Sequence, residues 1–226
     1  MASKVGSLGH FQGPNGHLFF ERQGNPDGQS ILFIHGLGGT TNAFQNLVPN
    51  LQDCDIIRFD WSGHGRSAIP QSSSLGSYVA DCEAIIGHLG LQSIVVVAHS
   101  LGGLIALHLA AKISDAVKAL VLLGPVRPPS KDGQEALSAR AEAVRKHGMG
   151  NIADTVVSNA FSSESLVKRK AEAALAREML TRQNSHGYAL AVEALRDSDA
   201  PQWARIKSKT IIVSGEQDKG VPGDST

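Results

Sequence analysis

The sequence predicts an α/β fold in which a mostly parallel sheet carries helices on both of its faces. Short, largely apolar segments recur at residues 31–34, 56–59, 94–97, 117–123 and 210–213, and the run 94–97 is uninterrupted and β-branched. Segments with helical periodicity, at 78–89 and 104–111, lie between several of them. Continuous apolar strands that alternate with helices are typical of a parallel sheet covered on both faces. A chain of 226 residues that is 42% hydrophobic is long enough to bury such a core.

The beginning of the chain predicts a hairpin followed by a third strand. Residues 7–12 and 17–22 flank the segment Gly13-Pro14-Asn15-Gly16. A second turn segment, Asn25-Pro26-Asp27-Gly28, leads into the apolar residues 31–34. Glycine, proline and asparagine favour tight turns because of their backbone preferences and local hydrogen bonds.

The alternation of strands and helices stops at Pro125 and resumes at residue 210. Residues 128–204 have helical patches at 135–146, 152–159, 165–182 and 188–196, and no convincing strand. We therefore predict a core made of residues 1–127 and 205–226, and a helical cap insertion, 128–204, over the carboxyl ends of the strands. The alternative is a set of ordinary packing helices with no role as a lid.

The charge balance argues against a polyanionic partner. Lys and Arg (21) equal Asp and Glu (21), so no long-range field favours nucleic acid or an anionic membrane surface. We expect a small, largely uncharged molecule as partner, with no cofactor and no metal. Cys54 and Cys82 have no metal-ligand spacing and do not suggest a disulfide framework. Residues 1–16 lack the features of a secretory signal and no apolar run would span a bilayer, so a cytoplasmic location is expected.

The strongest chemical signal is Ser100, which follows the apolar strand 94–97 and precedes a helix. A serine hydroxyl is a poor nucleophile at neutral pH, so it must stand clear of the sheet and reach a base. Ala98 and Gly102, two residues before and two after, are small enough to let a sharp turn close. This pattern predicts a nucleophile elbow with alanine in place of its first glycine. A plain helix N-cap is the alternative.

The segment His35-Gly36-Leu37-Gly38-Gly39 follows another apolar strand and predicts an oxyanion-binding turn. Acyl transfer builds negative charge on an oxygen, and backbone N–H groups held beside that oxygen stabilise it. We assign one donor to Leu37 and the other to Leu101. A simple strand-to-helix turn is an alternative, whereas a phosphate-binding loop is disfavoured because no lysine follows the glycines.

The segment 58–67, Arg-Phe-Asp-Trp-Ser-Gly-His-Gly-Arg-Ser, completes a resemblance. A strand ending in Asp, a Gly-x-Gly-x-Ser turn, the His-Gly turn and the serine elbow together resemble the α/β-hydrolase fold family. In that family this segment is structural, so we interpret His64 as a loop-packing residue. The resemblance places the triad acid after the cap, where Asp218 ends the pattern Gly-x-x-Asp; Glu216 is rejected on the same ground.

The family order also requires a histidine after the acid, and residues 219–226 contain none. All nine histidines lie upstream of Asp218. We therefore interpret the chain as a C-terminally shortened member that lacks the last strand and helix. Among substitutes, His99 is expected to turn into the packing behind the elbow, and His186 of the cap is conceivable.

The resemblance implies a carboxylic ester or lactone hydrolase that acts through an acyl-enzyme, with a small-molecule substrate and impaired activity for lack of the histidine. Ser100 stands where haloalkane dehalogenases and epoxide hydrolases of this fold carry aspartate. The cap segment 186–199 is similar to that of 3-oxoadipate enol-lactonases. Phe161, Met179 and Tyr188 suit an apolar pocket or, equally, core packing. The alternatives are a non-catalytic binding member of the fold and an inactive fragment.

Overall fold

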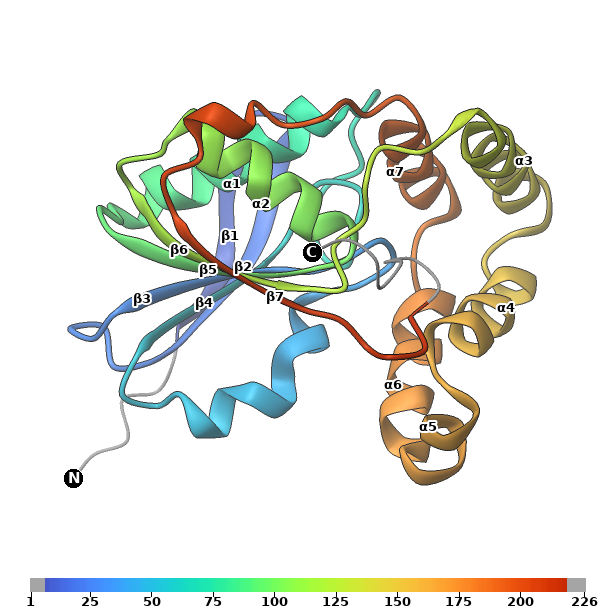
Figure 1. Cartoon of the computed structure of the whole chain (residues 1–226), viewed down its shortest axis with the longest axis horizontal. Coiled ribbons are helices and arrows are strands. Elements are labelled where there is room, and N and C mark those ends of the chain that lie inside the picture. The colour runs from blue at the N-terminus through green and yellow to red at the C-terminus, as the bar shows by residue number, and fades with distance from the viewer. Residues whose placement is uncertain (1–6, 219–226) are drawn as a thin grey trace.

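The computed structural model describes residues 7–218, and its centre is a seven-stranded sheet in the order β1-β2-β4-β3-β5-β6-β7 (Figure 1). The strands are β1 (Ser7–Gly13), β2 (Gly16–Gly24), β3 (Ser30–Ile34), β4 (Asp55–Asp60), β5 (Ile94–His99), β6 (Val117–Leu123) and β7 (Lys209–Val213). The pairs β1–β2 and β2–β4 are antiparallel and the other pairs are parallel. The predicted α/β class, the initial hairpin and the mostly parallel sheet are confirmed.

Both faces of the sheet are covered, because alternate residues of a strand point to opposite faces. Leu32 and Ile34 of β3 belong to the large cluster packed against helices α1 (Leu75–Leu89) and α2 (Leu101–Lys112). Ile31 and Phe33 pack on the opposite side, in a smaller cluster to which the 3-10 helix η1 (Thr41–Asn50) contributes. Figure 1 shows α1 and α2 on one side of the sheet and η1, in blue, on the other.

Strand β7 is the exception to this burial. It pairs in parallel with β6 and ends the sheet within the described part of the chain. Its side chains Ile211, Ile212 and Val213 are 62%, 59% and 50% exposed. An apolar strand that is exposed on both faces is unusual in a parallel sheet, where strands are normally buried on both sides.

The segment between β6 and β7 is helical and has a hydrophobic cluster of its own. Its helices are α3 (Lys131–His147), α4 (Gly150–Ala160), α5 (Ser163–Lys168), α6 (Lys170–Thr181) and α7 (Ser185–Arg196). Buried side chains such as Val144, Val157 and Val192 hold them together. The expected helical patch 165–182 is helical but not continuous: the chain breaks at Arg169, whose φ of −118° and ψ of 49° are not helical. Within the described residues, no helix has the length and apolar character needed to cross a membrane.

The cap helices lie beside the ends of the sheet strands in Figure 1 and contact the core loops there. The buried Gln183 donates from Nε2 to the carbonyl oxygens of Gly38 and Gly39, at 3.1 and 3.2 Å. Its Oε1 accepts from the N–H of Gly65 at 3.2 Å. The division into a core (1–127 and 205–226) and a cap (128–204) stays a prediction, and its residues 1–6 and 219–226 lie outside the described residues.

Candidate active site

Ser100 has a strained backbone at the junction of β5 and α2. Its φ of 54° and ψ of −121° make it the one non-glycine residue with positive φ among residues 7–218. Such conformations cost about 1–3 kcal/mol and are typical of functional sites. Ser100 occupies the N-cap position of α2, but its side chain makes no capping hydrogen bond. The simple N-cap alternative therefore does not describe this serine.

The small residue after the elbow is required by the close approach of β3. A β-carbon at Gly102 would lie 2.3 Å from the carbonyl oxygen of Ile34 and 2.5 Å from that of His35. These distances are too short for any side chain, so only glycine fits between α2 and the end of β3. Ala98, on the other side of the turn, is fully buried. The predicted use of small residues around Ser100 thus has a direct structural cause.

The loop after β3 lies against the elbow. A β-carbon at Gly36 would lie 3.0 Å from Cβ of Ser100, and Leu37 lines the same cavity as Ser100. Leu101 is the first residue of α2, where backbone N–H groups have no acceptor within the helix. Leu37, Ser100 and Leu101 are therefore brought together as expected. Their action as oxyanion donors stays a prediction.

Two buried histidines form hydrogen bonds with the backbone of this loop. His35 donates from Nδ1 to the carbonyl oxygen of Gly36 at 2.9 Å, and His64 accepts at Nε2 from the N–H of Gly38 at 3.0 Å. Burial lowers the pKa of His35 to about 3, and burial, aided by the charge of His35, lowers the pKa of His64 well below its ordinary value. Both rings are therefore neutral at pH 7. Trp61 packs on both rings, and this placement agrees with the structural role expected for His64.

Asp218 lies at the carboxyl end of β7 and approaches the end of β6. A β-carbon at Gly124 would lie 3.0 Å from Oδ2 of Asp218, and the Gly124 N–H donates to the carbonyl oxygen of Val213 at 2.8 Å. The carboxylate therefore sits next to the end of β6 although it follows β7 in sequence. Asp218 and the rejected Glu216 both line the cavity with Ser100.

His99 is more open to solvent than the sequence led us to expect. It is exposed and lines the cavity together with Ser100 and Asp218, although its Nδ1 still lies against the loop after β3, 2.9 Å from the position of a β-carbon at Gly36. The protein around the ring still desolvates it and lowers its pKa, and the charge of Asp218 opposes that shift. The other candidate, His186, is exposed on α7 and does not line the cavity.

The cavity has a volume of about 1070 Å³ and lies between the carboxyl ends of the strands and the helices of residues 131–196. Core residues Leu37, Ser100 and Asp218 form one wall, and residues of α3, α4, α5 and α7 form the other. Phe161 lines it as expected, whereas Met179 and Tyr188 do not. Arg140 of α3 also lines the cavity, and sequence reasoning missed it. In the sequence it cannot be distinguished from an arginine on the solvent-exposed side of a helix. Within residues 7–218 no cluster of His, Cys, Asp or Glu is arranged to hold a metal ion.

Comparison with known proteins identifies the family of this chain. The family model described as alpha/beta hydrolase fold matches residues 29–226. The chain is 27% identical over 202 residues to 3-oxoadipate enol-lactonase 2 of Acinetobacter baylyi, covering 86% of this chain and 73% of the relative. It is 26% identical over 215 residues to (E)-2-((N-methylformamido)methylene)succinate hydrolase of the same organism, covering 93% and 79%.

A solved structure extends the comparison to three dimensions. The crystal structure of a hydrolase from Pseudomonas aeruginosa superposes with a TM-score of 0.86 at 24% sequence identity, over 94% of this chain and 81% of that one. This likeness establishes the fold. The family model covers most of the chain. The chain therefore belongs to the α/β-hydrolase fold family of hydrolytic enzymes.

Proposed function

We propose that this chain is a hydrolase of carboxylic esters or lactones, with Ser100 as the nucleophile. The observation that carries the proposal is the strained backbone of Ser100 at the wall of a large cavity. A serine held at φ 54° between a strand and a helix presents its side chain away from both elements. Residues 128–204 act as the cap that closes the cavity over it.

The reaction uses the groups that surround Ser100. Its Oγ attacks the carbonyl carbon while a base takes the hydroxyl proton, and the carbonyl oxygen becomes negative. The N–H groups of Leu37 and Leu101 stabilise that oxygen. Collapse of the intermediate expels the alcohol, which takes the proton back from the base, and leaves an acyl-enzyme. Water then attacks the acyl carbon by the same steps and releases the acid and the free serine.

Asp218 serves in this scheme by accepting a hydrogen bond from the base and stabilising its charged form. In the printed sequence no histidine follows Asp218. We therefore propose that a polypeptide of these 226 residues hydrolyses esters slowly. Loss of the base that activates a catalytic serine reduces turnover by on the order of a millionfold. The slow reaction that remains is attack by the unassisted Ser100 hydroxyl on an activated ester, with the carbonyl oxygen held by the oxyanion donors.

The choice of esters and lactones is supported by the relatives. One is named as an enol-lactonase and another as a hydrolase of a succinate derivative. Phe161 and Val156 give the cavity apolar walls that suit the hydrocarbon part of such molecules. A non-catalytic member of the fold would keep this cavity and bind a small molecule there without acylating Ser100.

The test is hydrolysis of 4-nitrophenyl acetate by the purified chain and its Ser100→Ala variant. We expect slow release of nitrophenol that Ser100→Ala reduces to the rate in buffer, while Ser158→Ala, a change on the exposed side of α4, leaves it unaltered. Mass spectrometry after treatment with a fluorophosphonate should place the label on Ser100. Equal hydrolysis by the wild type and Ser100→Ala, with no label on Ser100, would favour the binding alternative.

A further inference from the structure

Arg140 is a cation of the cavity wall that forms no ion pair with a carboxylate among residues 7–218. It lies on α3, and its side chain lines the cavity that Ser100 also lines. The guanidinium donates a hydrogen bond to the hydroxyl of Tyr188 and lies over its ring, 5.2 Å from the centroid. The Nε atom is buried and has no hydrogen-bond partner.

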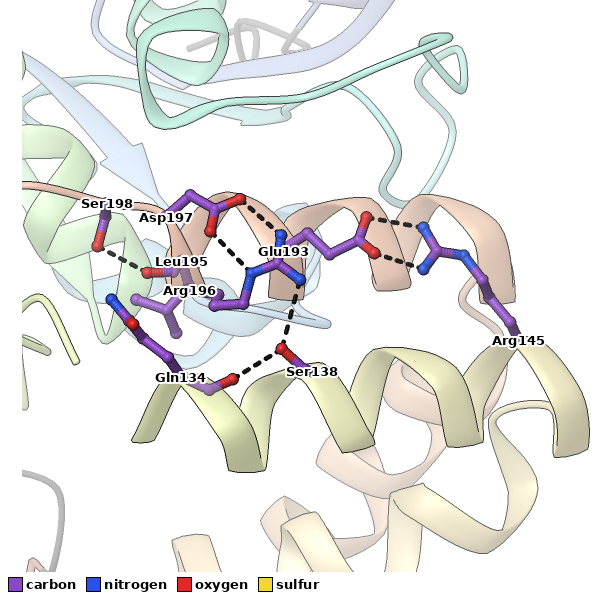
Figure 2. A network of polar contacts seen from close by, with 8 residues as sticks. All are labelled: Gln134, Ser138, Arg145, Glu193, Leu195, Arg196, Asp197 and Ser198. Atoms are coloured by element: carbon purple, nitrogen blue, oxygen red, sulfur yellow. Dashed lines mark hydrogen bonds and ion pairs between the residues drawn. The ribbon is translucent and has the colours of Figure 1, made fainter. Parts of the chain in front are cut away.

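Neighbouring arginines on the same two helices are arranged differently (Figure 2). Arg145 of α3 makes a two-pronged ion pair with Glu193 of α7, with distances of 2.5 and 2.7 Å. Arg196 of α7 makes another with Asp197, at 2.7 Å for both contacts. Figure 2 shows both pairs along the interface of α3 and α7. Arg140, which lines the cavity, is therefore the arginine of α3 that this interface leaves without a carboxylate partner among the described residues.

Burial without a counter-charge is costly for a guanidinium. Burial lowers the pKa of Arg140 to about 10, and no nearby carboxylate raises it again. The group is still positively charged at pH 7 but has lost much of its hydration. Glu164, Glu216 and Asp218 also line the cavity, and none of them forms an ion pair with Arg140. A carboxylate entering the cavity would supply the missing partner, because the planar guanidinium matches its two oxygens.

We propose that Arg140 binds a carboxylate group of the substrate, so that the ester or lactone cleaved at Ser100 is an anion. This inference rests on the proposed function, because it takes Ser100 as the reacting end of the same cavity. Ser100 belongs to the core wall and Arg140 to the cap wall, so the bound molecule spans the cavity from its reacting carbonyl to its carboxylate. Tyr188 positions the guanidinium through its hydroxyl. The proposal replaces the expectation of a largely uncharged substrate.

The experiment measures binding to Ser100→Ala, which does not need turnover. Two probes are used, the anionic half-ester 4-nitrophenyl hydrogen glutarate and the neutral 4-nitrophenyl hexanoate, with dissociation constants from calorimetry. Adding Arg140→Gln should weaken binding of the anionic probe about tenfold or more and leave the neutral probe unchanged. Arg145→Gln, which removes an equal charge from α3 at a position that does not line the cavity, is the matched control and should change neither. Arg140→Lys should retain part of the preference for the anion.

Three results would overturn the proposal: no binding of the anionic probe, equal weakening of both probes by Arg140→Gln, or equal weakening by Arg145→Gln. Thermal unfolding of each variant separates loss of the fold from loss of the anion site, and Arg140→Lys provides the folded variant if Arg140→Gln unfolds. The readout is independent of catalysis. If the wild type hydrolysed no ester but the anionic probe bound in a way that depends on Arg140, only the proposed hydrolase function would be contradicted. If hydrolysis depended on Ser100 but the anionic probe bound no better than the neutral one, only the proposed role of Arg140 would be contradicted.

Discussion

The backbone N–H of Gly38 donates to Nε2 of His64 over 3.0 Å, in a contact buried from solvent. It joins the loop after β3, which carries the proposed oxyanion donor Leu37, to the loop after β4. The bond requires an unprotonated Nε2, because a protonated histidine has no acceptor. The conformation of the proposed oxyanion loop is therefore linked to the protonation state of a residue that does not line the cavity.

Stability should fall when the solution is acidified below pH 6.5. The folded-state pKa of His64 is lowered below its ordinary value of 6.5, so the stabilisation is present above that value and is lost as the pH falls. Each such histidine contributes a slope of up to about 1.4 kcal/mol per pH unit. Asp60 offsets part of this loss of stability. Burial raises the pKa of Asp60 to about 6, so its protonation on acidification favours the folded state.

Urea unfolding at pH 7, 6 and 5 measures this slope. His64→Gln keeps an acceptor for the Gly38 N–H but cannot titrate, so the loss of stability per pH unit should be smaller than in the wild type. His147→Gln changes an exposed histidine and is the control, with a slope like that of the wild type. An unchanged slope in His64→Gln would contradict the prediction.

The sheet and the elbow were predictable because their signals are local. Short, largely apolar runs marked the parallel strands, and residues 117–123 matched β6 at both ends. The small residues around Ser100 reflected a true steric limit at Gly102. Local patterns of this kind are fixed by backbone geometry and burial, which sequence periodicity reports directly.

The cap and the cavity wall were less predictable because they depend on contacts between distant segments. The break at Arg169 has no proline or glycine to mark it. The exposure of His99 and the position of Arg140 follow from how the cap and the end of β7 sit on the core. A cation on an amphipathic helix has the same sequence signature whether it faces solvent or a cavity. Only the assembled fold distinguishes Arg140 from Arg145.

Gly102→Ala should destabilise the protein strongly. The new β-carbon would lie 2.3 Å from the backbone oxygen of Ile34, and neither backbone segment can yield without moving β3 or α2. We expect a loss of about 3 kcal/mol or more in the free energy of unfolding, as for other severe overpacking. Gly87→Ala is the matched control: that glycine lies in α1 with no atom within 4 Å of a new β-carbon, and the change should stabilise by about 0.5–1 kcal/mol. Urea unfolding compares the two, and similar effects from both would contradict the steric argument.

Ser100→Gly should be more stable than the wild type although it cannot act as a nucleophile. Glycine adopts φ 54° and ψ −121° without the steric cost that a β-carbon imposes. After the greater flexibility of glycine in the unfolded chain is subtracted, a net gain of about 1 kcal/mol is expected. Thermal and urea unfolding measure it, with Ser100→Ala as the variant that removes the hydroxyl but keeps the β-carbon. A stability of Ser100→Gly at or below that of Ser100→Ala would mean that the backbone is not strained.

Gln183 should hold the cap against the core. Its Nε2 donates to the carbonyl oxygens of Gly38, Gly39 and Met179, and its Oε1 accepts from the N–H of Gly65. Gln183→Leu keeps the volume but leaves these buried groups unpaired, at an expected cost of about 1–3 kcal/mol. Gln183→Glu should cost at least as much at pH 7, because a carboxylate accepts but cannot donate to carbonyl oxygens.

Hydrogen exchange distinguishes this local effect from general destabilisation. In Gln183→Leu, peptides from α6 and α7 should exchange faster while those from β5 and α2 keep wild-type protection, since partial opening of the cap does not require the sheet to unfold. Gln134→Leu, at an exposed position on α3, is the control for the substitution itself. If exchange in α6 and α7 stayed at the wild-type rate, the three hydrogen bonds from Gln183 to Gly38, Gly39 and Gly65 would not be what attaches the cap to these loops.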